Sequence, residues 1–101
     1  MDFSFTHKFS DLAVSVDGVD WYVTGSAEVY RPREGIHVPL QGIVIERLDR
    51  LESLLAHEHF NFPLDLLDSL QRSVFEIEIS TQLEADPKVS EWFQDELEAC
   101  L

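Results

Sequence analysis

Apolar and polar residues alternate along residues 12–23, on both sides of the dipeptide Asp17-Gly18. A repeat of two residues is typical of a β-strand that buries one of its faces. Asp-Gly readily adopts the two positive φ angles of a type I′ turn, so the pattern predicts a β-hairpin centred on this dipeptide. The expected cross-strand pairs, all on one buried face, are Val16 with Val19, Val14 with Trp21 and Leu12 with Val23.

The residues before the hairpin show the same repeat in the opposite phase. The phenylalanines of residues 3–9 occupy odd positions, whereas the apolar residues of 12–16 include the even positions that the hairpin buries. A regular strand presents alternate residues to opposite faces, so one regular strand cannot bury both sets. Residues 3–16 therefore form either one strand with a β-bulge near Ser10-Asp11 or two separate strands.

Beyond the hairpin the pattern predicts a longer second strand, a loop and a third strand. The second strand is expected to run on to Tyr30. Residues 31–35 contain a proline and a glycine, which favour a loop. A further strand is expected from Gly42 to Glu46, because this short run is rich in β-branched residues.

Leucines at helical spacing replace the alternation after Glu46. They recur at intervals of three and four residues from Leu48 to Leu55, which predicts a short helix over about residues 47–58. Glu46 and Arg50 are then expected to form a favourable i,i+4 ion pair where this helix begins.

A second helix is expected after the break at Asn61-Phe62-Pro63. Its apolar stripe is predicted to consist of Leu64, Leu67, Leu70 and Val74, widened by Leu66 and Ile77, with Asp65 and Asp68 in the first turns. Its end stays open, because Val74 to Ser80 also alternates as a strand would.

The last element is predicted to be a helix that starts at Asp86-Pro87. Asp is a favoured N-cap, and proline is favoured at the first helical position. The apolar residues that follow at helical spacing are Val89, Trp92, Phe93, Leu97 and Leu101. Because strands come first and helices second, we expect an α+β fold in a single domain of residues 1–101. It would have three to four antiparallel strands in the N-terminal half, packed by two to three helices from the C-terminal half.

The net charge says more about the function of the protein than any sequence motif does. Twenty acidic and seven basic residues give a formal net charge of −13. Residues 1–50 carry a net charge of −3, whereas residues 51–101, whose only bases are Arg72 and Lys88, carry −10. Such a chain repels nucleic acid and anionic membranes and favours a protein partner with a basic surface. Acidity also keeps a protein soluble, so solubility alone is the competing interpretation.

The expected location is the cytoplasm. Cys100 is the only cysteine, so no internal disulfide is expected. Residues 1–5 lack the basic and long apolar regions of a signal peptide, and no apolar run approaches the roughly 20 residues that cross a bilayer.

Candidate catalytic and metal-binding groups are sparse, and we expect no enzyme, cofactor or metal. His57-Glu58-His59 is the local cluster of ligand types. Residues i and i+2 point to different sides of a helix, so the two histidines could share one ion on a strand but not easily on a helix. A polar helix end is the simpler interpretation. Cys100 lies one residue from the end of the sequence, where the held geometry of a nucleophile is not expected.

The predicted partner-binding residues are acidic. Glu91, Asp95 and Glu98 fall within one arc of the last helix, opposite its apolar residues, while Glu96 falls within the apolar arc. Glu84 and Asp86 extend the negative run before this helix. A helical row of carboxylates resembles a row of phosphates, although a solvated helix face is an alternative.

Two further candidate contact surfaces remain. Trp92-Phe93 is either core or an interface anchor. The arginines at 31, 33, 47 and 50 either balance the acids or form a second contact surface.

The hairpin run VSVDGVDWYVTGSAEVYRPREG, then GIVIERLD and a leucine-rich segment, resembles small uncharacterised bacteriophage proteins. The resemblance covers roughly residues 12–80 and implies a phage or prophage setting, with no catalytic residues. In that setting we expect an inhibitor, of the anti-CRISPR or anti-restriction type, that blocks the cationic nucleic-acid-binding surface of a host defence protein in the host cytoplasm. The alternatives are an immunity protein or antitoxin that neutralises a basic toxin, and a phage structural or assembly factor.

Overall fold

The structure, a computed structural model, describes residues 4–31, 35–50, 64 and 67–100. Its strands are β1 (Ser4–Val16), β2 (Val19–Tyr30) and β3 (Ile43–Arg50). A 3-10 turn, η1 (Leu40–Gly42), precedes β3, and the helices are α2 (Ser69–Ala85) and α3 (Pro87–Ala99). The strands form one antiparallel sheet in the order β1-β2-β3.

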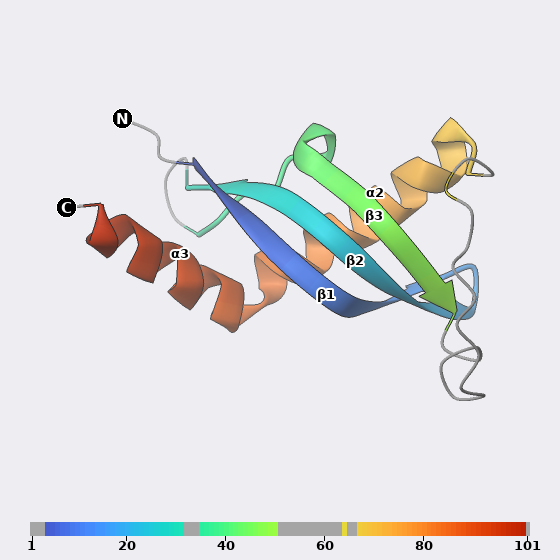
Figure 1. Ribbon diagram of the computed structural model, residues 1–101, viewed down its shortest axis with the longest axis horizontal. Coiled ribbons are helices and arrows are strands. Elements are labelled where there is room, and N and C mark those ends of the chain that lie inside the picture. The colour runs from blue at the N-terminus through green and yellow to red at the C-terminus, as the bar shows by residue number, and fades with distance from the viewer. Residues whose placement is uncertain (1–3, 32–34, 51–63, 65–66, 101) are drawn as a thin grey trace.

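The α+β arrangement is therefore confirmed, with the sheet in the N-terminal half and the helices in the C-terminal half. Over the residues described, the sheet has three strands and there are two α-helices. Figure 1 shows that α2 crosses behind the sheet and that α3 lies at the edge of the sheet formed by β1. The opposite face of the sheet carries no helix in the described part of the chain (Figure 1).

The predicted hairpin and its register are confirmed. Asp17 has φ 53° and Gly18 has φ 77°, as a type I′ turn requires. The pairs Val16–Val19, Val14–Trp21 and Leu12–Val23 all form across this turn. Since the turn is set by two adjacent residues, the strand register follows directly from the local sequence.

β1 is one strand with a bulge, which decides between the two alternatives for its described residues. The pairing register shifts between Phe9 and Leu12, and Asp11 has φ 51°. The Asp11 N–H donates to Thr24 Oγ1 at 3.1 Å instead of joining the regular ladder. The bulge exchanges the faces to which odd- and even-numbered residues of β1 point. Phe9 and Val14 are therefore both buried on the same face, although one position is odd and the other even.

The helix predicted over residues 47–58 is wrong for its first four residues, because β3 continues to Arg50. A second register shift, at Thr24/Gly25, leaves Glu46 as an extra residue in β3. Ile45 and Leu48 therefore both reach the buried face at a spacing of three, which resembles helical periodicity. The helical i,i+4 arrangement predicted for Glu46 and Arg50 is wrong too, because both residues lie in β3. Residues 51–58 lie outside the described part.

Gly25 makes room for this second bulge. A Cβ atom built on Gly25 would overlap the carbonyl oxygen of Val44 on the neighbouring strand. Glycine is therefore required at this position because β2 and β3 approach closely there.

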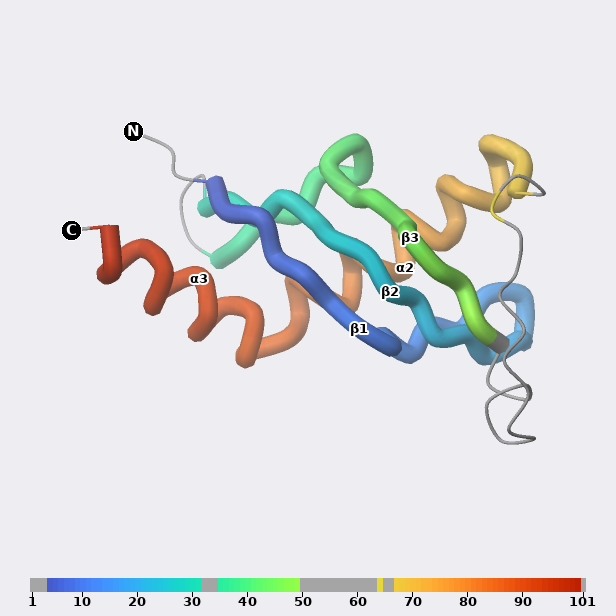
Figure 2. Tube along the Cα trace, in the orientation of Figure 1, coloured from blue at the N-terminus to red at the C-terminus, as the bar shows by residue number. Residues whose placement is uncertain are grey.

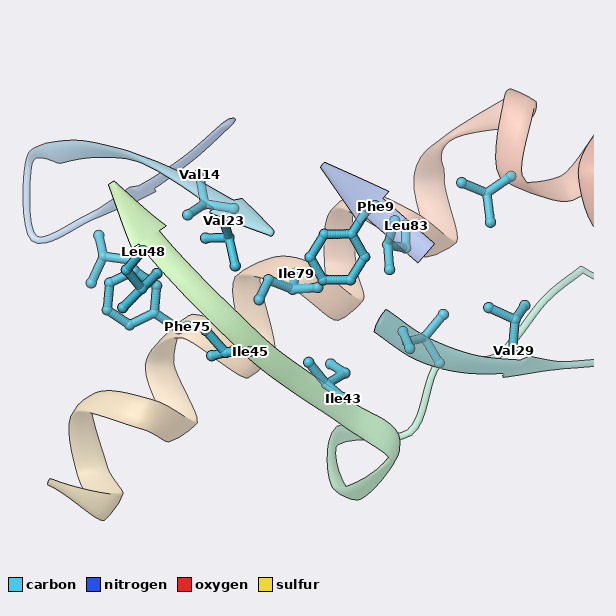
Figure 3. Close-up of a cluster of buried hydrophobic side chains, with 14 of the residues drawn as sticks. Phe9, Val14, Val23, Val29, Ile43, Ile45, Leu48, Phe75, Ile79 and Leu83 are labelled. Atoms are coloured by element: carbon cyan, nitrogen blue, oxygen red, sulfur yellow. The ribbon is translucent and has the colours of Figure 1, made fainter. Parts of the chain in front are cut away.

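The core lies between one face of the sheet and α2 (Figure 3). Phe75, Ile79 and Leu83 recur every four residues and form the buried side of α2. Against them pack buried side chains from all three strands, among them Phe9, Val14, Val23, Val29, Ile43, Ile45 and Leu48.

The predicted start of the second helix is wrong, and so is its apolar stripe at Leu70 and Ile77, which are exposed, whereas Val74 packs partly buried against the core. α2 starts at Ser69, where the Asp68 carboxylate accepts from the Gln71 N–H at 2.7 Å and completes a capping box. Leu70 lies on the side of α2 away from the buried Phe75, Ile79 and Leu83, and it is 75% exposed. The segment Val74–Ser80, which stayed open between helix and strand, is helical. Leu64 and Leu67 precede α2 and pack partly buried on the core; the predicted break at residues 61–63, Asp65 and Leu66 lie outside the described residues.

The last helix starts as predicted. Asp86 is the N-cap of α3 and accepts from the Lys88 N–H at 2.9 Å, and Pro87 occupies the first turn. Val89 and Phe93 are buried, and Trp92 and Leu97 are partly buried against the same core. α3 ends at Ala99, and Leu101 lies outside the described residues.

Candidate partner-binding surface

α3 is attached to the first half of β1 by aromatic contacts. The Phe5 ring makes an edge contact with Phe93 at 5.3 Å between centroids and with Trp92 at 6.4 Å. The His7 ring lies 4.6 Å from Trp92. Figure 2 shows the resulting position of α3 beside the start of β1. Because this side of α3 is buried, the opposite side faces solvent.

Phe93 also takes part in a contact with Arg31 at the end of β2. The Arg31 guanidinium lies 5.1 Å from the centre of the Phe93 ring and donates through Nη1 to Gln94 Oε1 at 2.8 Å. Phe93 is 1% exposed, so of the two interpretations of Trp92-Phe93 the core role holds for Phe93. Trp92 is half-buried, with its ring against those of Phe5 and His7 on β1.

The solvent side of α3 carries three acidic side chains, Glu91, Asp95 and Glu98, which we call the α3 acidic face. All three are exposed, and by helical geometry they lie within an arc of roughly 60°. In the part of the chain that the structure describes, no basic side chain forms an ion pair with them. Glu98 accepts one hydrogen bond, from Gln94 Nε2 at 3.3 Å. Their charge is therefore directed at solvent.

Glu84 belongs to a different arrangement. Its Oε1 accepts from the Val38 N–H at 2.9 Å and lies 3.3 Å from His37 Nδ1. The Ser80 hydroxyl, one turn earlier on α2, donates to the Val38 carbonyl at 2.7 Å. Together these bonds fasten the segment before η1 to α2, so the Glu84 carboxylate is already occupied within the chain.

Asp86 likewise has a structural task, since its side chain caps α3. The five predicted binding residues thus separate into an exposed group of three on α3 and two acids with partners inside the chain. Glu96, which the sequence places within the apolar arc, is exposed.

Of the four arginines considered as a second contact surface, Arg31 and Arg47 have partners within the chain. Arg47 Nε lies 2.8 Å from Asp49 Oδ2, and Arg47 Nη2 lies 3.1 Å from Asp11 Oδ1. Asp49 is 5% exposed, so this pair neutralises a buried carboxylate. Arg31 is bound to Gln94 as described above, Arg33 lies outside the described residues, and only the backbone of Arg50 is described.

His7 is a titratable group held inside the contact between β1 and α3. Burial beside Trp92 lowers its pKa below the ordinary value of 6.5, and the nearby Asp86 carboxylate opposes this shift in part. Neutral imidazole is therefore the form that suits the folded protein.

Groups suited to chemistry do not converge in the described part of the structure. No three His, Cys, Asp or Glu side chains among the residues described are grouped to hold a metal ion, and His57-Glu58-His59 lies outside them. Cys100 is exposed at the C-cap of α3. An open hollow of about 430 Å³ on the outer sheet face is lined by Thr6, Ser26, Glu28, Gln41, Gly42 and Val44. Glu28 is the titratable residue in that lining.

Reasoning from the sequence missed an exposed apolar surface on α2. Leu70 is 75% exposed and Ile77 is 49% exposed, although the sequence placed both in the apolar stripe of the second helix. The signal that could have found them is the competing apolar run Phe75, Ile79 and Leu83 at four-residue spacing, which forms the buried side of α2.

No family model, curated protein or solved structure matches this chain. The resemblance to phage proteins thus stays a prediction. Neither helix in the described part of the chain is long and apolar enough to cross a membrane.

Proposed function

We propose that this protein is a small acidic binding protein that presents the α3 acidic face to a basic surface of another protein. The observation that carries the proposal is that Glu91, Asp95 and Glu98 are exposed together on a helix whose other side is buried. Fixed charges on a rigid element attract an oppositely charged partner without first having to be ordered.

The net charge of −13 supports the same proposal. A long-range negative field speeds encounter with a basic protein and disfavours nucleic acid itself. The three acids span about 10 Å along α3, the distance covered by roughly three phosphate-to-phosphate steps of one DNA strand. In the phage setting implied by the resemblance of residues 12–80, the proposed partner is a host defence protein that binds nucleic acid, and its cationic surface would be blocked.

The test compares three forms of the protein as bait in a bacterial lysate, followed by rate measurements on the purified captured protein. The first form is the wild type, and the second carries Glu91→Lys, Asp95→Lys and Glu98→Lys. The third is a matched control that reverses three exposed acids on the sheet, Asp20→Lys, Glu28→Lys and Glu46→Lys. Equal overall charge in the two variants separates the position of the charge from its amount.

The α3 variant is expected to associate at least tenfold more slowly than the matched control, because complementary charge acts mainly on the association rate. Raising salt from about 0.05 to 0.5 M should weaken wild-type binding more than binding by the α3 variant, since screening removes the same attraction. DNA should compete with the wild type for the partner. Equal rates and equal salt slopes for the two variants would show that the α3 acidic face is an ordinary solvated surface.

A further inference from the structure

The side of α2 that faces away from the sheet carries a row of two aliphatic and two hydroxyl residues. Leu70, Ser73, Ile77 and Thr81 are all exposed and recur at intervals of three and four, and we call them the α2 outer stripe. They lie within an arc of roughly 80° and extend over about 16 Å, or three helical turns. Val74, half-buried, lies at the margin of the stripe.

The two hydroxyl groups of the stripe are already satisfied within the helix. Ser73 Oγ donates to the Ser69 carbonyl at 2.9 Å, and Thr81 Oγ1 donates to the Ile77 carbonyl at 2.8 Å. Their donor hydrogens are used, so covering them with an apolar surface does not leave an unpaired donor. The stripe is therefore less costly to bury than its composition suggests.

The charged residues beside the stripe have one sign. Glu76 and Glu78, the chain neighbours of Ile77, stand about 100° to either side of it. Arg72 is the basic residue of α2, and it lies on the far side of the helix, roughly 145° from the centre of the stripe. An apolar row between acidic margins is the complement of a helix with an apolar row between basic margins.

We propose that the α2 outer stripe binds an amphipathic helix of the partner protein, with leucine-like side chains on Leu70 and Ile77 and basic side chains beside Glu76 and Glu78. The proposal deepens the proposed function, since the partner is again basic, but it places apolar contact on α2. Charge favours this occupant over a second copy of the chain. Two copies would bring the same acidic margins together, and each carries a net charge of −13.

The probe is a synthetic 18-residue peptide of leucine and lysine with leucine on one helical face, titrated by fluorescence anisotropy. Two further peptides serve as controls: the same composition in scrambled order, and the amphipathic order with glutamate in place of lysine. The test variant is Leu70→Gln with Ile77→Gln, since glutamine keeps the helix while removing apolar surface. The matched control, Leu40→Gln with Val44→Gln, removes two other exposed apolar side chains, which are 37% and 54% exposed.

We expect the amphipathic basic peptide to bind the wild type at least tenfold more tightly than either control peptide. The α2 variant should lose about tenfold or more in affinity, and the matched control should stay within about twofold of the wild type. Amide shifts in NMR spectra of the labelled wild type should change at Leu70, Val74 and Ile77. Equal binding of the ordered and scrambled peptides, or an unchanged affinity of the α2 variant, would overturn the proposal.

The same titration separates this inference from the proposed function. If reversal of Glu91, Asp95 and Glu98 abolishes peptide binding while the α2 variant binds normally, the α3 acidic face stands and the α2 stripe is refuted. If only the α2 variant loses binding, the stripe stands and the α3 face fails. A wild type that sediments as a dimer, and an α2 variant that sediments as a monomer, would assign the stripe to a second copy and overturn the proposed occupant.

Discussion

Replacing Phe93 by alanine removes the ring that holds α3 against the sheet. Phe93 is 1% exposed, contacts Phe5 at 5.3 Å between ring centres and lies under the Arg31 guanidinium. Truncation of a buried phenylalanine to alanine costs about 3–5 kcal/mol, from lost burial and from the cavity that remains. Domains of this size are stable by only about 5–15 kcal/mol, so the variant should be strongly destabilised.

Urea unfolding followed by circular dichroism measures this loss of stability. Phe93→Leu is the companion variant, because it keeps most of the buried volume and should cost less than about 1.5 kcal/mol. It also provides a measurable value if the alanine variant does not fold. A loss below about 1 kcal/mol for Phe93→Ala would refute the reasoning, because it would mean that α3 does not depend on this contact.

Two further predictions concern single titratable residues. Glu84→Gln should lower stability by about 1 kcal/mol in urea unfolding, because the charged acceptor for the Val38 N–H, which also lies beside His37, is lost, yet leave partner binding intact. Loss of binding with unchanged stability would contradict this. His7→Gln should flatten the fall of stability below pH 6.5, the ordinary pKa of histidine. The folded protein lowers the pKa of His7, so the unfolded state takes up the proton more readily as the pH falls. Parallel pH–stability curves for wild type and variant would disprove it.

Elements set by neighbouring residues were predictable from the sequence. The hairpin register follows from Asp17-Gly18, whose positive φ angles bring the strands together without help from the rest of the chain. The start of α3 follows from Asp86-Pro87 in the same way, because the cap and the proline act within one helical turn. The opposite phases of residues 3–9 and 12–16 also pointed to the bulge that Asp11 makes in β1.

The α3 acidic face was predictable for a related reason. Once the start of α3 is known, helical periodicity places Glu91, Asp95 and Glu98 on one side and Val89 and Phe93 on the other. Their exposure then follows from the burial of the apolar side.

Only the tertiary structure decided the elements whose periodicity depends on a distant partner. β3 extends to Arg50 because pairing with β2 tolerates the extra residue Glu46 opposite Gly25, which brings Ile45 and Leu48 to one face at a helix-like spacing. The sequence did not identify the buried side of α2, because Leu70 is as apolar as Leu83. Only packing against the sheet selects which of the two leucines is buried.

The roles of the acidic residues depended on the fold in the same way. Glu84 and Glu91 are chemically identical, but the segment that carries His37 and Val38 approaches Glu84 from 46 residues away and occupies its carboxylate. Local sequence determines a turn or a cap because the interacting atoms are close along the chain. Which side of α2 is buried, and which acids remain free to bind a partner, is determined by segments that meet only when the chain folds.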